Sequence, residues 1–281
     1  MPEHRTAVVT GATGGIGRFV ALGLAQAGME VVLVGRDPGR GAAATAWIRD
    51  QVQDARLHFM LADLSSLGET CALGTAIAGA HPRLSVLVNN AGVFLPRRTT
   101  TAEGHETVLA VNHLSPFVLT RLLEPALRAG APARLVTVGS STADTALIDP
   151  ANLELRHGWG LKHAYAQSKL AATMTTFKWA RRWSGTGVVA NVVHPGTVAT
   201  GLVRARGVIG LAWRVMALFS RTEQQGADTP VFVATAPELE TVTGTYFKDR
   251  RPARPNHRAL DEVLVQRVWT ATEDLVTQGP A

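Results

Sequence analysis

The stretch Arg5-Thr6-Ala7-Val8-Val9-Thr10-Gly11-Ala12-Thr13-Gly14-Gly15-Ile16-Gly17 decides the fold of this 281-residue chain. Its first six residues predict a short buried strand, and the apolar run 19–27 after the glycines predicts a helix. Glycines at such a junction let the backbone approach a pyrophosphate, and the helix N-terminus offers N–H donors and a positive dipole end. A simple tight turn is the alternative, because the spacing Gly-x-x-x-Gly-x-Gly differs from Gly-x-Gly-x-x-Gly.

Further short, apolar and continuous runs follow the first strand, and helical stretches separate them. This alternation predicts parallel strands that are covered by helices on both faces. We expect strands at 30–34, 56–61, 85–88 and 134–138, and helices at 38–53, 65–80 and 102–128.

Polar and glycine-rich segments stand at the carboxyl ends of these strands, where open α/β sheets bind their ligands. The segments are Asp63-Leu64, Asn89-Asn90-Ala91-Gly92 and Gly139-Ser140-Ser141.

A tyrosine and a lysine lie four residues apart in Tyr165-Ala166-Gln167-Ser168-Lys169 and therefore one turn apart on a helix face. An ammonium beside a phenol favours the phenolate, so we expect Lys169 to lower the pKa of Tyr165 towards neutrality. The spacing also occurs by chance in surface helices, where it marks an ordinary solvated pair. The surrounding motifs favour the catalytic reading.

Together these motifs resemble the short-chain dehydrogenase/reductase family over about residues 5–250. Its marks, in the family's order, are Thr10-Gly11-x-x-x-Gly15-Ile16-Gly17, Asn89-Asn90-Ala91-Gly92, Asn112, Ser140, Tyr165-x-x-x-Lys169 and Pro195-Gly196. Finer marks resemble the branch of the retinol dehydrogenases and their bacterial relatives. These are Val111-Asn112-His113-Leu114, Tyr165 to Ala171, His194 to Thr200, Thr222 to Ala227, Pro237-Glu238-Leu239 and Gly244-Thr245-Tyr246-Phe247.

The resemblance implies an α/β fold: a single-domain Rossmann-type doubly wound parallel sheet of about seven strands, with helices on both faces. No linker, repeat or low-complexity tract divides the chain, so we expect one domain over 1–281. Its dinucleotide-binding half would span about 5–140, and its catalytic and substrate half about 141–281.

The resemblance also implies hydride transfer between a nicotinamide and a carbonyl or carbinol carbon. Tyr165 would be the acid/base, and Lys169 would tune it and hold the nicotinamide ribose. Ser140, rather than Ser141, would hydrogen-bond the substrate oxygen, and Asn112 would support a water-linked proton path to Lys169. Ser115-Pro116 departs from the family's usual Gly-His, which leaves the geometry next to Asn112 open.

The end of the second strand predicts the cofactor, because NAD enzymes usually place an acidic residue there for the ribose 2′-hydroxyl. Here Gly35 takes that place, and Arg36 can meet a 2′-phosphate, so NADP(H) is favoured over NAD(H). Asp37 would restore the acid if the register shifted by two, although Asp-Pro-Gly more naturally caps the next helix. The expected cofactor-binding residues are Gly11, Thr13, Gly15, Ile16, Gly17, Arg36, Asp63, Leu64, Asn90, Ala91, Gly92, Tyr165, Lys169, Pro195, Gly196, Val198 and Thr200.

Composition and charge set the expected surroundings of the protein. The single Cys71 excludes an intramolecular disulfide framework, and neither a signal peptide nor an apolar run long enough to span a membrane occurs. The net charge of +6 is spread along the chain without a nucleic-acid motif, and no Cys/His spacing suggests a metal. We therefore expect a cytoplasmic protein that binds neither membrane, nucleic acid nor metal, and we read the dense run Arg250 to Arg254 as a surface loop.

Two segments of the sequence are candidates for contact with the substrate. The stretch 149–163 lengthens the gap between Ser140 and Tyr165 and contains His157, Trp159 and His163; a substrate contact is possible there, but solvated histidines are the favoured reading. The apolar stretch 201–220 predicts a lid over a lipophilic or aromatic ketone, alcohol or aldehyde, or a packed helix.

The sequence thus predicts an NADP(H)-dependent ketoreductase or alcohol dehydrogenase. Two alternatives remain: non-redox use of the fold, as in a dehydratase, epimerase or cyclase, and a dinucleotide-binding sensor or scaffold. Relatives of the second kind usually lose the catalytic residues, which are all present here. The family's usual interface further implies a homodimer or homotetramer through helices 102–128 and 162–182, although the C-terminal segment could equally cover Trp179 and Trp183.

Overall fold

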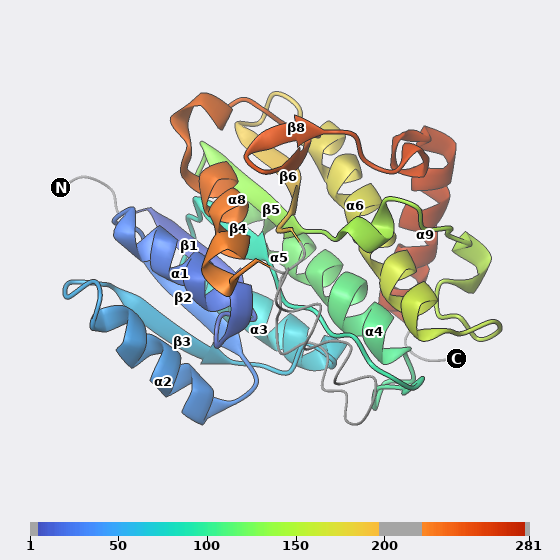
Figure 1. The fold of residues 1–281 in the computed structure, drawn as a ribbon, viewed down its shortest axis with the longest axis horizontal. Helices are drawn as coiled ribbons and strands as arrows, with labels where there is room; N and C mark the ends of the chain where they lie inside the picture. Colours follow the sequence, from blue (N-terminus) through green and yellow to red (C-terminus); the bar gives the residue numbers. More distant parts are fainter. Residues whose placement is uncertain (1–4, 197–220, 279–281) are drawn as a thin grey trace.

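The computed structural model describes residues 5–196 and 221–278, and the strands of this part form one eight-stranded sheet (Figure 1). Their spatial order is β3-β2-β1-β4-β5-β6-β7-β8, so the order reverses between β1 and β4. The strands are β1 (Thr6–Thr10), β2 (Glu30–Gly35), β3 (Leu57–Leu61), β4 (Val86–Asn89), β5 (Ala133–Val138), β6 (Val188–His194), β7 (Tyr246–Lys248) and β8 (Arg251–Ala253). Such a reversal opens a crevice for ligands at the carboxyl ends of the strands.

The eighth strand corrects the expected sheet of about seven parallel strands. The first seven strands pair in parallel, whereas β8 pairs antiparallel with β7. The link between them is too short for a crossover helix, and its residues Asp249 and Arg250 take positive φ values of 54° and 59°. The run read as a surface loop is therefore partly an edge strand, where Pro252 costs no ladder hydrogen bond.

Helices cover both faces of the sheet (Figure 1). On one face α1 packs against α2 and α8, and on the other face α3 packs against α5, and α6 against α9. The helices are α1 (Gly15–Gln26), α2 (Pro38–Arg49), α3 (Leu67–Ala80), α4 (Thr107–Leu109), α5 (Ser115–Ala129), α6 (Leu161–Arg182), α8 (Glu223–Thr235) and α9 (Glu262–Gln278).

The central strands β1, β4 and β5 are buried at every position and carry mostly apolar residues. Val8 pairs in register with Val32 and Leu87 and faces the α3 and α5 side, while Val9 faces the α1 side. Both side chains are fully buried. This double core explains why the strands read as continuous apolar runs rather than as alternating ones.

The single helix expected over 102–128 is interrupted around Asn112. Helix α4 runs into a π-helical turn at Ala110–Leu114, and α5 follows it. Pro116 has no N–H to donate to the carbonyl of Asn112 four residues earlier, and the Ser115 hydroxyl donates instead to the carbonyl of Leu64 at 2.6 Å. Ser115-Pro116 thus belongs to a local widening of the helix, a feature often found at functional sites.

An aromatic cluster joins the C-terminal helix to the face that α5 and α6 present. The Trp269 ring of α9 lies 4.8 Å from both Phe117 and Trp179, and Trp183 stacks on Trp179 at 4.9 Å, centroid to centroid. The C-terminal segment therefore covers Trp179, one of the two arrangements that the sequence left open. Assembly of several copies stays a prediction.

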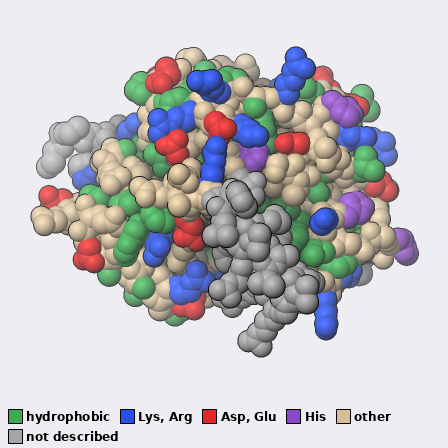
Figure 2. All heavy atoms as spheres, viewed as in Figure 1, with side chains coloured by type: hydrophobic (Ala, Val, Ile, Leu, Met, Phe, Trp, Pro, Cys, Tyr) green, Lys and Arg blue, Asp and Glu red, His purple; other side chains and the backbone are tan. Residues whose placement is uncertain are grey.

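The surface carries both signs of charge. On the face shown in Figure 2, Lys and Arg side chains are interspersed with Asp and Glu rather than gathered into one patch. Among the residues that the structure describes, no helix is both long and apolar enough to cross a membrane.

Candidate active site

The glycine-rich turn between β1 and α1 is shaped by close backbone contacts. Gly11 and Gly15 take left-handed φ values of 65° and 56°, which favour glycine. A Cβ on Gly17 would overlap the carbonyl oxygen of Gly11, and a Cβ on Gly11 would lie 3.0 Å from Cα of Ala91. No side chain caps the N-terminus of α1 and no acidic residue lies in its first turn, so its N–H groups suit an anionic ligand.

The end of β4 is tied directly to this turn. The Thr10 hydroxyl accepts hydrogen bonds from the backbone N–H groups of Asn90 and Ala91, both at 3.0 Å. The Asn90 amide donates in return to the carbonyl of Thr10 at 2.9 Å. These hydrogen bonds hold the ends of β1 and β4 together at the point where the strand order reverses, and this surface could bind a dinucleotide.

The end of β2 presents arginines and no free carboxylate of its own. A Cβ on Gly35 would overlap the Thr13 side chain, whereas the Arg36 side chain is 67% exposed. Asp37 caps α2, because its carboxylate accepts the backbone N–H of Arg40 at 2.9 Å. The register in which Asp37 would serve a ribose is therefore not the one the structure shows.

A second arginine reaches the glycine-rich turn from α2. A Cβ on Gly14 would lie 2.5 Å from Nη2 of Arg40, so this guanidinium stands directly beside the turn. Arg40 was not among the predicted cofactor-binding residues. Its place in the first turn of α2, directly after the capping Asp37, was the available signal.

The end of β3 is held against α5 and lies beside Arg36. Asp63 lies 3.9 Å from Nη1 of Arg36 and accepts the backbone N–H of Ser65 at 2.9 Å. The carbonyl of Leu64 accepts the Ser115 hydroxyl. The predicted pair Asp63-Leu64 therefore lies on the same edge of the sheet as Arg36.

The four predicted catalytic side chains converge at the carboxyl ends of β4 and β5. The Asn112 amide accepts the N–H of Val93 at 2.7 Å and donates to the Ser168 hydroxyl at 3.0 Å, which ties the π-helical turn to α6. A Cβ on Gly92 would lie 3.3 Å from both Asn112 Oδ1 and Lys169 Nζ. Gly92 thus keeps space open between these two groups, as a bound ribose would require.

Lys169 is buried, with 4% of the residue exposed, and its ammonium donates to the carbonyl of Val138 at 2.8 Å. Burial lowers the pKa of Lys169 to about 8, which leaves it mainly protonated at neutral pH. An ammonium has three donors, and this is its one hydrogen bond among the described residues. The remaining N–H groups fit ribose hydroxyls.

Tyr165 departs from the expected ionisation. Burial raises the pKa of its phenol, and a hydrogen bond with the Ser140 side chain only partly opposes this. Lys169 Nζ lies 5.9 Å from the centre of the Tyr165 ring and is hydrogen-bonded to a carbonyl instead. The expectation that the ammonium lowers the pKa of the tyrosine is therefore wrong for the protein in this state, because desolvation dominates.

The substrate side of Tyr165 is apolar. Its ring meets Phe94 edge to face at 5.1 Å and packs in one cluster with Val93, Leu95 and Trp159. Ser141 is exposed and begins a short 3-10 turn, so Ser140 is the serine that faces the phenol.

The long stretch 149–163 is anchored by buried polar groups rather than free. The His105 imidazole lies 2.9 Å from the Glu154 carboxylate, and the Trp159 indole donates to Glu106 at 3.4 Å. His157 and His163 are exposed, in keeping with the solvated reading. His105, Glu106 and Glu154 were missed, because only the folded chain brings residues some fifty positions apart together.

The remaining predicted cofactor contacts follow β6. Pro195 and Gly196 lie at its carboxyl end, and Gly196 has a left-handed φ of 85°. Val198, Thr200 and the lid expected at 201–220 lie outside the described residues. Among the residues that are described, no group of acidic, histidine or cysteine side chains is placed to hold a metal.

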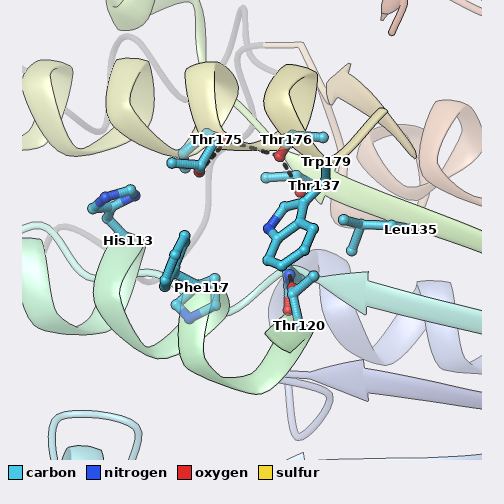
Figure 3. Close-up of a pocket in the computed structure, with 11 residues that line it drawn as sticks. His113, Phe117, Thr120, Leu135, Thr137, Thr175, Thr176 and Trp179 are labelled. Carbon is cyan, nitrogen blue, oxygen red and sulfur yellow. Dashed lines mark hydrogen bonds between the residues drawn. The ribbon is translucent and has the colours of Figure 1, made fainter. Parts of the chain in front are cut away.

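A small cavity lies behind the site, between α5, α6 and the sheet (Figure 3). Its walls include His113, Phe117, Thr120 and Trp179 but not Ser140, Tyr165 or Lys169, so it is separate from the candidate substrate site. Burial lowers the pKa of His113 to about 3, which keeps its ring neutral. Its Nε2 lies 2.8 Å from the Thr272 hydroxyl.

The match with known proteins defines the class. The family model described as short chain dehydrogenase matches residues 5–207, and the chain belongs to this family. The fold, the site and this membership make it an NAD(P)-dependent oxidoreductase acting on CH–OH and C=O groups.

The relatives place it in the branch that resembles the retinol dehydrogenases. It is 42% identical to polyprenol dehydrogenase of Mus musculus, covering 94% of this chain and 82% of that protein. It is 35% identical to retinol dehydrogenase 12 of Homo sapiens, covering 97% and 86%. It is 39% identical to a putative daunorubicin C-13 ketoreductase of Streptomyces sp. strain C5, covering 95% and 91%.

A solved structure has a similar fold. A putative NAD(P)-dependent gluconate 5-dehydrogenase from Beutenbergia cavernae, with bound NADP, is similar with a TM-score of 0.70 and 31% identity. The match covers 87% of this chain and 94% of that one.

Proposed function

We propose that the protein is an NADP(H)-dependent ketoreductase or alcohol dehydrogenase for lipophilic or aromatic substrates, with Tyr165 as acid/base. The observation that carries the proposal is the gathering of Asn112, Ser140, Tyr165 and Lys169 beside a glycine-rich turn suited to a pyrophosphate. When bound, the nicotinamide supplies the hydride.

The chain's own residues position the substrate and move the proton. Because burial keeps Tyr165 protonated, its phenol is ready to donate a proton to a carbonyl oxygen during reduction. Ser140 would hydrogen-bond the same oxygen. The Lys169 ammonium would hold ribose hydroxyls through the donors that its hydrogen bond to Val138 leaves free, and Asn112 keeps α6 aligned through Ser168.

The preference for NADP(H) rests on the end of β2. Two guanidinium groups, Arg36 and Arg40, flank the place where an adenosine 2′-phosphate would lie, and Asp37 is engaged as a helix cap. A guanidinium binds phosphate well because its planar fork gives charge-assisted hydrogen bonds. The NADP bound to the similar gluconate 5-dehydrogenase is consistent with this choice.

The substrate class rests on the apolar surroundings of the phenol. Phe94 and Trp159 lie beside Tyr165 together with Val93 and Leu95, so a substrate oxygen within reach of Ser140 would bring its carbon skeleton against apolar side chains. Relatives named for polyprenol, retinol and daunorubicin fit this expectation.

Steady-state assays with NADPH and NADH, followed by nicotinamide absorbance, test the proposal. The carbonyl panel should contain an isoprenoid aldehyde, a retinoid aldehyde, an aromatic polycyclic ketone and a small hydrophilic ketone as control. We expect turnover with NADPH on the lipophilic compounds and a loss of at least about 10²-fold with Tyr165→Phe. Turnover of the hydrophilic ketone alone would overturn the substrate class. Cofactor binding without turnover on any carbonyl would favour non-redox use or a sensor.

A further inference from the structure

His194 ends β6 immediately before the turn Pro195-Gly196, and the proposed function assigns it no part. The residue is buried, with 3% exposed, at the carboxyl edge of the sheet. Its Nδ1 accepts the backbone N–H of Gly196 at 2.8 Å. This hydrogen bond folds the turn back onto the side chain that precedes it.

Arg221 packs against the same turn. A Cβ on Gly196 would lie 2.5 Å from Cδ of Arg221, whose guanidinium pairs with Asp249 at 2.6 Å. Gly196 is thus held between an imidazole and an arginine stem, in a left-handed conformation that glycine tolerates. Two independent contacts determine where the turn stands relative to the catalytic side chains.

The hydrogen bond from Gly196 requires a particular form of the ring. A backbone N–H can be accepted only by an unprotonated ring nitrogen, so Nδ1 must be bare and the proton must sit on Nε2. In the imidazolium both ring nitrogens are donors, and the N–H of Gly196 would face another N–H. Charging His194 therefore breaks the contact that holds the turn.

The groups around the ring bear on its protonation. Burial is the largest cause that lowers the pKa of His194, and Lys248 and Arg221 act in the same direction, while Asp144 and Asp249 oppose them. Asp144 is itself hydrogen-bonded by the Tyr246 hydroxyl at 3.0 Å. With burial dominant, the neutral ring prevails at physiological pH.

We propose that neutral His194 is the positioning residue for the nicotinamide-binding turn, and that its protonation releases the turn and weakens dinucleotide binding in acid. The inference rests on the proposed function, because it takes Pro195-Gly196 as part of the dinucleotide site. Affinity should be constant near neutrality and fall as the pH drops, by up to about tenfold per pH unit once His194 titrates.

The test is calorimetric titration of the intact protein with NADP⁺, which is stable in acid, from neutral pH to about pH 5. The matched variant is His194→Asn, whose Oδ1 can stand where Nδ1 stands but does not titrate. We expect the wild type to lose affinity in acid and His194→Asn to lose at least threefold less over the same range. Ionisation of the 2′-phosphate affects both proteins equally, so the difference isolates the ring.

Two further variants complete the design. His194→Val removes the acceptor and should weaken binding by about threefold to tenfold near neutral pH, since one hydrogen bond is lost, and this difference from the wild type should shrink in acid. His163→Asn, an exposed histidine on α6, should behave as the wild type. Identical acid profiles for the wild type and His194→Asn would overturn the inference. If the wild type bound no dinucleotide at any pH, the proposed function itself would fail.

Discussion

The two ends of the candidate dinucleotide site use opposite physical means. At the adenosine end, Arg36 is two-thirds exposed, so its charge acts through solvent and costs little to keep. At the nicotinamide end, Lys169 and Asn112 are almost wholly buried, and the pKa values of Lys169 and Tyr165 shift because of that burial. Exposed charge suits recognition of a phosphate, whereas buried groups suit proton transfer, since low dielectric makes each interaction stronger.

The largest effect should come from the buried end. Tyr165→Phe removes only the phenolic oxygen and should lower turnover by about 10²- to 10⁴-fold, the usual contribution of general acid–base catalysis. NADPH affinity, measured by fluorescence titration, should change by less than about twofold because the ring stays packed on Phe94. Wild-type turnover in this variant would mean that another group donates the proton.

Lys169 offers a test through stability. Its pKa in the folded protein is about 8 against an ordinary 10.5, so between these values the unfolded chain holds a proton that the folded chain has released. Stability should therefore rise with pH through this window, by up to about 3 kcal/mol at roughly 1.4 kcal/mol per pKa unit.

Urea unfolding of the dinucleotide-free protein at several values between pH 8 and pH 10 measures this gain. Lys169→Met should remove it, whereas Lys162→Met, an exposed lysine on the same helix, should keep it. An equal gain in Lys169→Met would show that other groups cause the pH dependence.

The exposed end should give a smaller and more selective effect. Arg36→Ala and Arg40→Ala should each weaken NADPH about tenfold to a hundredfold, because each removes a charge-assisted contact to phosphate. NADH binding should change little, and the loss should shrink in high salt, which screens exposed charge. Arg49→Ala, exposed in the last turn of α2, is the matched control. Equal losses for both dinucleotides would remove the case for a 2′-phosphate site.

The features of the site that could be predicted from the sequence are those with local causes, whereas the features that could not be predicted have tertiary causes. The glycine-rich turn and the Tyr165–Lys169 pair are local signals, because each lies within one strand–turn–helix unit or one helical turn. The approach of Arg40 to Gly14 and of Glu106 to Trp159 depends on packing between distant segments. The direction of the Tyr165 pKa was mispredicted for the same reason, since burial cannot be read from the spacing of two residues.

The strands show how much of the sheet topology can be predicted from the sequence. Short, continuous apolar runs marked β1 to β5, and the runs of β1, β2, β4 and β5 are buried almost throughout. Strand β8 has three residues, two of them exposed, and includes Pro252. Neither its composition nor its hydrophobic periodicity therefore predicted a strand. Its pairing follows from the sharp reversal at Asp249 and Arg250, two residues with positive φ that no turn glycine signalled.

The smallest expected effect separates capping from cofactor choice at Asp37. Its carboxylate accepts the backbone N–H of Arg40, so Asp37→Ala should lower the free energy of unfolding by about 1 kcal/mol, the usual cost of losing an N-cap. Asp37→Ser, which retains a capping oxygen, should lose much less. The ratio of NADPH to NADH affinity should stay within about twofold in both variants, because a capping carboxylate has no ribose hydroxyl to serve. A marked shift of that ratio towards NADPH in Asp37→Ala, measured by fluorescence titration, would instead make Asp37 a determinant of cofactor choice.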